Sequence, residues 1–419
     1  MREKSVFSSI DWWTVLIYIC LILFGWINIY SAVYNEEHQS IFDLSQRYGK
    51  QLLWMLLAFV LGFLILLIDA KFFNAFAFPI YILLLLVLAY VLFFGDEIAG
   101  SKSWIKIGSF ALQPAEFAKF ATALVVASYL GRLNVNLRDR KTQLKAFLLV
   151  LIPAGMILAQ NDTGSALVFA SFILVFYREG MSGLIMVLGI IAVLLFVLTL
   201  YFSQKVVLIG LVALFIILSL FLIKRNKKYI LRLLGILVVC CGFVFSVNYV
   251  FENVLGAHQK NRINVLLGIT KDLKGVGYNI NQSKIAIGSG GFSGKGFLNG
   301  TQTKYNFVPE QSTDFIFCTV GEEWGFVGCF ATIALYITLL VRLLILSERQ
   351  RSTFSRIYGY SIASILFFHF TVNIGMTIGL MPVIGIPLPF FSYGGSSLWA
   401  FTIMLFVFIR QDANRLQIL

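Results

Sequence analysis

The chain has 419 residues, of which 59% are hydrophobic and only 13% are charged, and its net charge is +13. A soluble domain is about half apolar and about a quarter charged, so this composition excludes a soluble enzyme, a disordered protein and a secreted disulfide scaffold. It predicts an all-α polytopic membrane protein, because helices satisfy their own backbone groups in lipid. All five cysteines lie in apolar runs, which argues against a disulfide framework.

About twelve segments are apolar and long enough to be membrane helices, since a span needs roughly 20 mostly apolar residues. In chain order they are 12–33, 51–69, 73–94, 114–131, 146–160, 164–178, 181–202, 205–223, 230–250, 315–341, 355–380 and 390–409. The first segment has no small-residue cleavage site, so we expect a retained anchor rather than a signal peptide. We predict one integral membrane domain over 1–419.

The basic residues predict how these helices are oriented. With a cytoplasmic N-terminus and alternating helices, 20 of the 33 Lys and Arg residues fall in cytoplasmic segments and five fall in short outer loops. This is the positive-inside distribution, so we expect both termini in the cytoplasm. The positive charge is then mostly a topology signal, and we expect no nucleic-acid partner.

The stretch 251–314 is a long, polar, glycine-rich loop on the predicted outer side. A loop well beyond about 15 residues is usually functional or disordered, and its aromatic residues favour order. Its run 288–296 is not a Walker A motif, because Ser289 and Gly296 stand where Gly and Ser or Thr are required. The amides beside Lys284 and Lys295 could cradle a pyrophosphate, although a turn-rich loop is the simpler interpretation.

Ionisable residues inside the predicted spans are expensive in lipid and usually face a cavity. Glu116 and Lys119 are three residues apart on the fourth span, so they share a helix face and can form an ion pair. A structural pair and a functional cavity both remain open. Glu322 and Glu323, inside the tenth span, also suggest a cavity.

Two aspartates stand at the outer ends of predicted helices. Asp162 lies at the kink between the fifth and sixth spans, where it could cap a helix, act in function, or do both. Asp314 begins the tenth span after Pro309 and a polar run, a helix-start pattern. It could complement the helix dipole or act as a general base, and the spacing alone favours the dipole role.

The other polar candidates are individually weaker. Arg47 starts an outer helix and could bind a phosphate, although a snorkelling interface residue is the simpler interpretation. His369 and Asn373, four residues apart, resemble packing residues that hydrogen-bond between helices. The cluster containing Ser396 and Ser397 opens the last span and allows close packing or a polar rim.

Five stretches together resemble the SEDS family (shape, elongation, division and sporulation proteins). They are GSKSWI at 100–105, QPAEFAK at 113–119, QNDTGSA at 160–166, QSKIAIGSGGFSGKGFLNGTQTKYNFVPEQSTDFIF at 282–317 and GLMPVIGIPLPFFSYGGSS at 379–397. The resemblance covers most of the chain. The last two stretches are more similar to the elongation-type members of the family than to the division-type members.

The resemblance implies a peptidoglycan glycosyltransferase of the bacterial inner membrane that polymerises lipid II on the extracytoplasmic face for cell elongation. It implies a class B penicillin-binding transpeptidase as partner, and Mg²⁺ or Mn²⁺ as a cofactor with unknown ligands. Asp314 matches the family's essential aspartate and is the expected catalytic residue. The residues that we expect to bind substrate are Arg47, Glu116, Lys119, Asp162, Lys284, Ser396 and Ser397.

The chain departs from the family pattern in two places. The family core has ten spans, so about two are extra, and 181–229 is the candidate extra helical hairpin. Asn161 stands where the family usually has proline, which puts the local kink geometry in question.

Three other functions remain open: a lipid II flippase or other transporter, a non-catalytic scaffold, and a division-type polymerase. A transporter places its polar cluster near the bilayer midplane. Arg47, Asp162 and Asp314 instead map to the outer ends of helices, which favours chemistry at the membrane surface.

Overall fold

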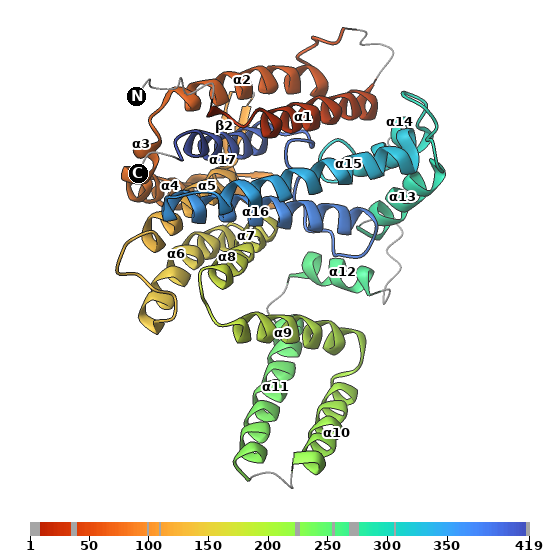
Figure 1. The fold of residues 1–419 in the computed structure, drawn as a ribbon. Coiled ribbons are helices and arrows are strands. Elements are labelled where there is room, and N and C mark those ends of the chain that lie inside the picture. The colour runs from red at the N-terminus through yellow and green to blue at the C-terminus, as the bar shows by residue number, and fades with distance from the viewer. Residues whose placement is uncertain are drawn as a thin grey trace. The chain divides into compact units, whose positions relative to one another are not determined.

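The computed structural model describes residues 9–34, 40–98, 100–108, 110–222, 227–253, 256–267, 276–305 and 307–415 (Figure 1). The chain divides into two compact units. The first unit comprises 1–181 and 279–419, and the second comprises 182–278.

The first unit carries every predicted site residue. Its helices are α1 (Trp12–Val33), α2 (Arg47–Leu67), α3 (Ala70–Ala75), α4 (Ala77–Phe94), α5 (Pro114–Leu130), α6 (Arg140–Ala159), α7 (Thr163–Val168), η2 (Phe169–Ser171), α8 (Phe172–Arg178), α13 (Val276–Ser289, which begins just before the unit), α14 (Thr301–Lys304), α15 (Ile316–Glu348), α16 (Thr353–Thr377) and α17 (Gly395–Ala413).

The second unit contains α9 (Gly183–Tyr201), α10 (Gln204–Leu222), α11 (Lys227–Asn253) and α12 (Ala257–Leu266). Helices α9, α10 and α11 pack against one another around Leu195, Val207 and Val244. The hairpin predicted at 181–229 corresponds to α9 and α10, with residues 223–226 outside the described part of the chain.

The predicted polytopic helical fold is confirmed. By length and composition, eight helices of the described chain can cross a membrane, namely α1, α2, α4, α6, α9, α11, α15 and α16. Two shorter apolar stretches, 163–178 and 204–220, and the helices α5 and α17 account for the other predicted segments.

One element was not expected, a small antiparallel sheet between α4 and α5. Its strands are β1 (Asp96–Ile98), β2 (Ser101–Ile107) and β3 (Phe110–Leu112), in the order β1-β2-β3. Hydropathy analysis does not detect it, because the strands are short and only partly buried. Pro114, at the first position of α5, follows the sheet directly.

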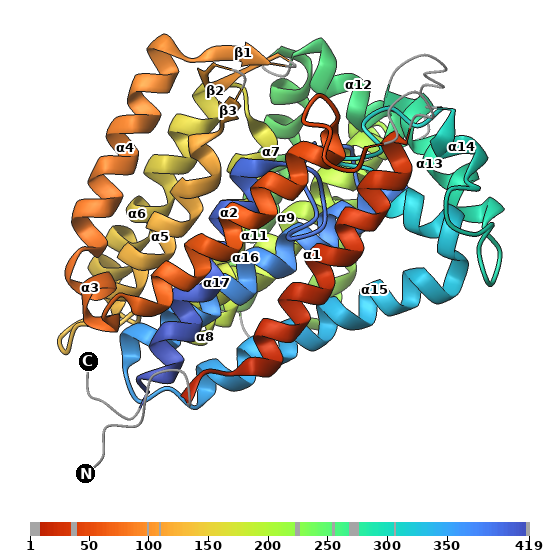
Figure 2. The same cartoon turned by 90° about the horizontal axis from the view of Figure 1, so that it is seen from above.

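Helix α16 is the most buried of the candidate spans, with 78% of its apolar stretch inside the protein. It packs against α5, α8, α15 and α17, and Figure 2 shows it behind α1 and α2. Polar side chains on such a helix need protein partners, because neither water nor headgroups reach them.

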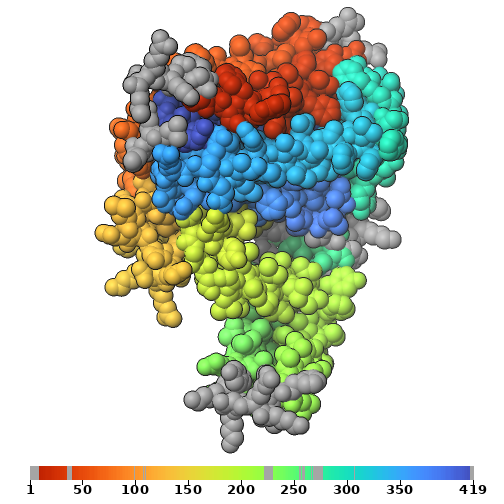
Figure 3. All heavy atoms as spheres, viewed as in Figure 1, coloured from red at the N-terminus to blue at the C-terminus, as the bar shows by residue number. Residues whose placement is uncertain are grey.

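Ion pairs tie the start of α1 and the end of α17 to the C-terminal half of α15. Asp11 accepts from Arg342 Nε at 3.1 Å, and Asp412 accepts from Arg349 Nε at 2.9 Å. Burial raises the pKa of the Asp11 carboxyl, but hydrogen bonds from Arg342 and Thr14 outweigh it and hold that pKa below its usual value. Helices α1 and α15 lie side by side on the face seen in Figure 3. Asp314 precedes α15, so it lies at the other end of that helix.

Candidate active site

Asp314 is half-buried and lies two residues before the first residue of α15. The carbonyls of residues 312–314 each accept a hydrogen bond from a different group. In order, the donors are the Tyr393 backbone amide (2.9 Å), the Ser392 hydroxyl (2.6 Å) and the Asn373 side-chain amide (2.9 Å). The backbone that carries the predicted catalytic residue is therefore held from both the 392–393 turn and α16.

Arg47, the first residue of α2, lies beside this segment. Its Nη1 donates to the Ser312 hydroxyl at 2.6 Å and lies 3.8 Å from a Glu310 carboxylate oxygen. Its guanidinium carbon is 5.8 Å from the centre of the Tyr393 ring. The Arg47 side chain is 45% exposed, so it can also meet an anionic ligand.

The segment 384–388, between α16 and α17, forms one wall beside Asp314. Gly385 has a φ of +77°, and a Cβ placed there would lie 3.4 Å from Asp314 Oδ2. Gly164, in α7, approaches from another side, since a Cβ there would lie 2.7 Å from the Ile384 carbonyl oxygen. The start of α7 and the start of α15 thus meet on the same short segment.

Asp162 caps α7, and through Gln113 it also connects α7 to the start of α5 and to α17. Its Oδ1 accepts from the Ser165 amide at 3.0 Å at the start of α7, and its Oδ2 accepts from Gln113 Nε2 at 2.7 Å. The Gln113 backbone amide donates to Ser396 Oγ at 3.1 Å, whereas the Ser397 hydroxyl donates to the Gly394 carbonyl of its own turn. Asp162 and Ser396 are therefore linked through Gln113, and their substrate-binding role stays a prediction.

The kink before α7 differs from the geometry that proline can adopt. Asn161 has a φ of +61°, in the left-handed region that asparagine tolerates. Proline is fixed near −65°, so a family proline at this position requires a different local backbone.

Glu116 and Lys119 form a buried ion pair of 2.8 Å, with 2% and 0% of their side chains exposed. Lys119 Nζ also lies 2.9 Å from His369 Nε2, and His369 Nδ1 lies 3.1 Å from the Pro387 carbonyl oxygen. The pair thus supports the wall segment from inside the protein. Its direct contact with substrate stays a prediction, and the described geometry favours a positioning role.

The glycine-rich run packs into a break in α15. Gly325 interrupts that helix with a φ of +61° and a ψ of −153°. The backbone groups that the break leaves without helical partners form hydrogen bonds with the glycine-rich run. Lys295 and Gly296 amides donate to the carbonyls of residues 322 and 323 at 3.0 Å each, and the carbonyls of residues 291 and 292 accept from residues 326 and 327. The simpler interpretation of the run, a turn-rich loop, agrees with these bonds.

Glu322 anchors this loop and Glu323 binds α1, and the cavity that the sequence suggested beside them stays a prediction. Glu322 accepts from Lys295 Nζ at 2.6 Å and from the amides of residues 301–303 at the start of α14. Glu323 accepts from the Ser31 hydroxyl of α1. Both carboxylates are buried. The partners of Glu322 explain why it is tolerated there, whereas Glu323 Oε2 has no hydrogen-bond partner in the described chain.

The close fit of this loop predicts a specific loss of stability in Gly294→Ala. Gly294 has a φ of +80°, and a Cβ there would lie 2.0 Å from the Glu323 carbonyl oxygen. We expect a left-handed penalty of about 1–2 kcal/mol plus an overpacking cost of about 1–3 kcal/mol, measured as a lower unfolding temperature in detergent. Gly291→Ala is the matched control, because its φ is +58° but no atom lies within 4 Å. Equal losses in both variants would contradict the close packing.

Lys284 is exposed on α13, which docks on the end of α16. The neighbouring Ser283 hydroxyl donates to the Thr377 carbonyl at 2.9 Å, and Lys284 Nζ would lie 3.3 Å from a Cβ on Gly379. Its position at this end of α16 is compatible with an anionic ligand, and its binding role stays a prediction.

The described residues do not form an all-protein cage for a metal ion. Among them, no group of three His, Cys, Asp or Glu side chains is placed to hold a metal. Glu310 and Asp162 already have protein partners, because Glu310 lies beside Arg47 and Asp162 caps α7.

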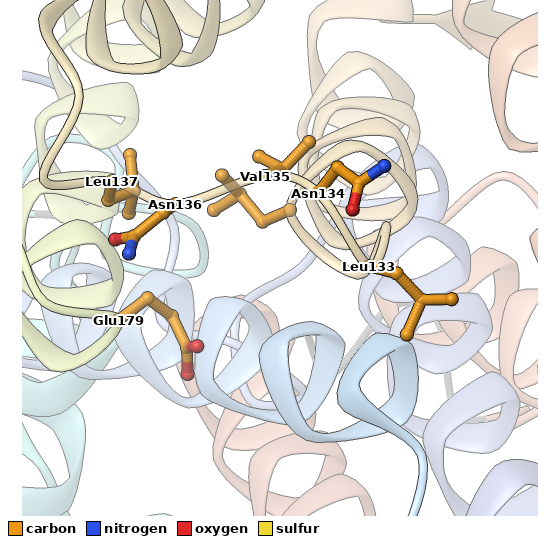
Figure 4. A pocket seen from close by; sticks show the side chains of 7 residues that line it. Leu133, Asn134, Val135, Asn136, Leu137 and Glu179 are labelled. Carbon is orange, nitrogen blue, oxygen red and sulfur yellow. The ribbon is translucent and has the colours of Figure 1, made fainter.

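A cavity of about 320 Å³ lies at the opposite end of α5 from Gln113 (Figure 4). It is lined by Leu130, residues 133–137 and Glu179. Glu179 pairs with Arg356 at 2.9 Å. The cavity contains none of the predicted site residues and is separate from the site around Asp314.

Comparison with known proteins decides the family. The family model FtsW/RodA/SpoVE, described as a cell cycle protein, matches residues 11–216 and 185–415, which together cover nearly the whole chain. The chain belongs to the FtsW/RodA/SpoVE family.

Relatives within the FtsW/RodA/SpoVE family cover the chain almost completely. The peptidoglycan glycosyltransferase RodA of Treponema pallidum (strain Nichols) is 33% identical over 99% of this chain and 100% of its own length. MrdB of Escherichia coli (strain K12), also named a peptidoglycan glycosyltransferase, is 32% identical over 92% of this chain and 88% of its own. These relatives confirm the predicted resemblance to elongation-type members.

A solved structure shows the same fold. It comes from work on the structural coordination of polymerization and crosslinking by a peptidoglycan synthase complex. The two chains superpose with a TM-score of 0.69 and 28% identity, over 97% of this chain and 99% of that chain.

Several polar residues of this family member were not assigned to the site from the sequence. Gln113, Ser312 and Ser392 each connect two predicted elements. The sequence feature that these residues share is a position close to a predicted helix start. Many polar surface residues have such a position, so it does not single out a site. Asn373 was interpreted as a packing residue, and its contact with Asp314 depends on the tertiary fold.

Proposed function

We propose that this chain polymerises lipid II into glycan strands for cell elongation, with Asp314 as the general base. Membership of the FtsW/RodA/SpoVE family and relatives named peptidoglycan glycosyltransferases support the glycosyltransferase activity. The observation that carries the site assignment is the half-buried carboxylate of Asp314, two residues after Ser312, whose hydroxyl accepts a hydrogen bond from Arg47.

The proposed reaction joins two lipid II molecules. Asp314 accepts the proton of the acceptor's GlcNAc 4-hydroxyl while that oxygen forms a bond to the anomeric carbon of the donor. The donor's bond to its pyrophosphate breaks, and undecaprenyl pyrophosphate leaves. A positioned base typically contributes about 10²–10⁴ in rate, and Arg47 offers a charged fork for the pyrophosphate oxygens.

We infer that the site faces the extracytoplasmic side of the bacterial inner membrane, with both termini in the cytoplasm. Asp11 and Asp412, close to the two ends of the described chain, lie at the end of α15 opposite Asp314, which supports this arrangement. The positive-inside distribution supports the choice of side.

We also propose a class B penicillin-binding transpeptidase as partner. The similarity to a chain from a peptidoglycan synthase complex supports it. Dependence on Mg²⁺ or Mn²⁺ stays a prediction from the resemblance, and no step above relies on a metal.

The direct test is an assay of the purified full-length chain with lipid II, alone and with the transpeptidase. Polymeric glycan detected by gel electrophoresis is the expected result. Movement of lipid II across a vesicle membrane without any polymer would contradict the proposal and support a transporter.

Removing the charge of Arg47 should weaken use of lipid II. Hydrogen bonds to charged groups are worth about 1.5–3 kcal/mol, so Arg47→Ala should raise the KM for lipid II by roughly 10- to 100-fold. Arg47→Lys keeps the charge but loses the fork and should give an intermediate KM. An unchanged KM in Arg47→Ala would remove Arg47 from the binding site.

A further inference from the structure

We propose that Asn373 is a positioning residue that holds Asp314 against the wall segment 384–388. This inference rests on the proposed function. Asn373 lies on the buried helix α16 and is 0% exposed. Its Nδ2 donates to the Asp314 carbonyl at 2.9 Å and to the Ile386 carbonyl at 2.8 Å.

Both hydrogens of the Asn373 amide are therefore used. One bonds the backbone of Asp314, and the other bonds the wall segment against which Asp314 lies. Asp314 Oδ2 rests near Gly385, next to the Ile386 that Asn373 also holds. One side chain thus fixes the distance between the backbone of Asp314 and the segment against which its carboxylate lies. A primary amide suits this task because it has two donors on one nitrogen.

The position of Asp314 just before α15 explains why its backbone needs a hydrogen bond from another segment. At the start of α15, the Cys318 amide donates to the Phe315 carbonyl at 2.9 Å. The backbone carbonyls of residues 312–314 precede the helix, and polar backbone groups inside a protein need hydrogen-bond partners. Ser392 and Tyr393 supply two of them, and Asn373 supplies the third, directly on Asp314.

A second interhelical contact supports the same wall. His369, one turn away on the same face of α16, lies 3.1 Å from the Pro387 carbonyl oxygen. His369 is in turn held by the buried Lys119. Asn373 differs from His369 because its side chain also donates to the Asp314 carbonyl.

The test compares Asn373→Ala with wild type in the lipid II polymerisation assay, using the full-length chain. A misplacement of about 1 Å can cost roughly 100-fold in rate. We expect kcat to fall by about 10- to 100-fold while the KM for lipid II changes by less than about twofold.

Asn28→Ala is the matched control. Asn28 is also 0% exposed, lies on α1, and donates only to the Phe24 carbonyl of its own helix at 2.8 Å. In both asparagines, Oδ1 lacks a hydrogen-bond partner in the described chain. Asn28→Ala should keep the wild-type kcat. Asn373→Ala should have the lower unfolding temperature of the two, because it removes two hydrogen bonds to other segments.

The outcomes separate this inference from the proposed function. If the wild-type protein makes no glycan, the proposed function fails. If the wild type is active and Asn373→Ala keeps its kcat, or loses it only to the extent that Asn28→Ala does, the positioning role is overturned. If Asn373→Ala does not fold, Asn373→Asp takes its place, because it keeps the shape of the side chain but lacks the donor nitrogen. An unchanged kcat in Asn373→Asp overturns the positioning role.

Discussion

Asp314→Asn is expected to abolish glycan polymerisation while leaving the protein folded. The substitution keeps the shape of the side chain but removes the proton acceptor, and a general base contributes about 10²–10⁴ in rate. The carbonyl of residue 314 should keep its hydrogen bond from Asn373, since that bond involves only the backbone acceptor. The measurement is the rate of polymer formation from lipid II, with the unfolding temperature measured in parallel.

Asp96→Asn provides the control for this experiment. Asp96 lies on β1, is 44% exposed, and its carboxylate is 3.9 Å from Lys106. It should retain the full polymerisation rate. If Asp314→Asn made glycan as fast as this control, Asp314 would not be the base.

Lys119→Met should destabilise the protein strongly. Lys119 is fully buried, and its loss would leave the Glu116 carboxylate in the protein interior without its cation. Breaking a buried ion pair on one side typically costs about 3–5 kcal/mol. The expected result is a large fall in the unfolding temperature of the purified protein, together with a loss of the yield of folded protein.

Two further variants test the cause of that loss. Glu116→Gln combined with Lys119→Met removes both charges and should recover much of the stability, because no uncompensated charge remains. Lys106→Met breaks the exposed pair with Asp96 and should cost at most about 1 kcal/mol. If Lys119→Met had an unchanged unfolding temperature and a raised KM for lipid II, Lys119 would act in substrate binding instead.

The positions of the spans could be predicted because hydropathy and length are local properties of the chain. The break in α15 could not. The prediction of one span over 315–341 treats Gly325 as an ordinary helical glycine, whereas its conformation depends on bonds with residues 291–296. The small sheet after α4 escaped prediction for a related reason, since its strands are short and only partly buried.

The candidate site was predicted residue by residue but not as an arrangement. Asp162 and Asp314 were found because an acid at a helix start has a local signature. Whether the buried pair of Glu116 and Lys119 faces a cavity or the protein interior depends on what packs against it, and that partner is His369, 250 residues later.

Composition, hydropathy and charge alone determined that this chain is a helical membrane protein and which residues are out of place in lipid, because the cost of burying a polar group depends on residue type. The tertiary structure alone decided which of those residues meet. It joins Arg47, the 312–314 backbone, Asn373 and the 384–388 segment around Asp314, although they come from four separate parts of the chain. Hydrogen bonds act only over about 3 Å, so such a site exists only once the helices have packed.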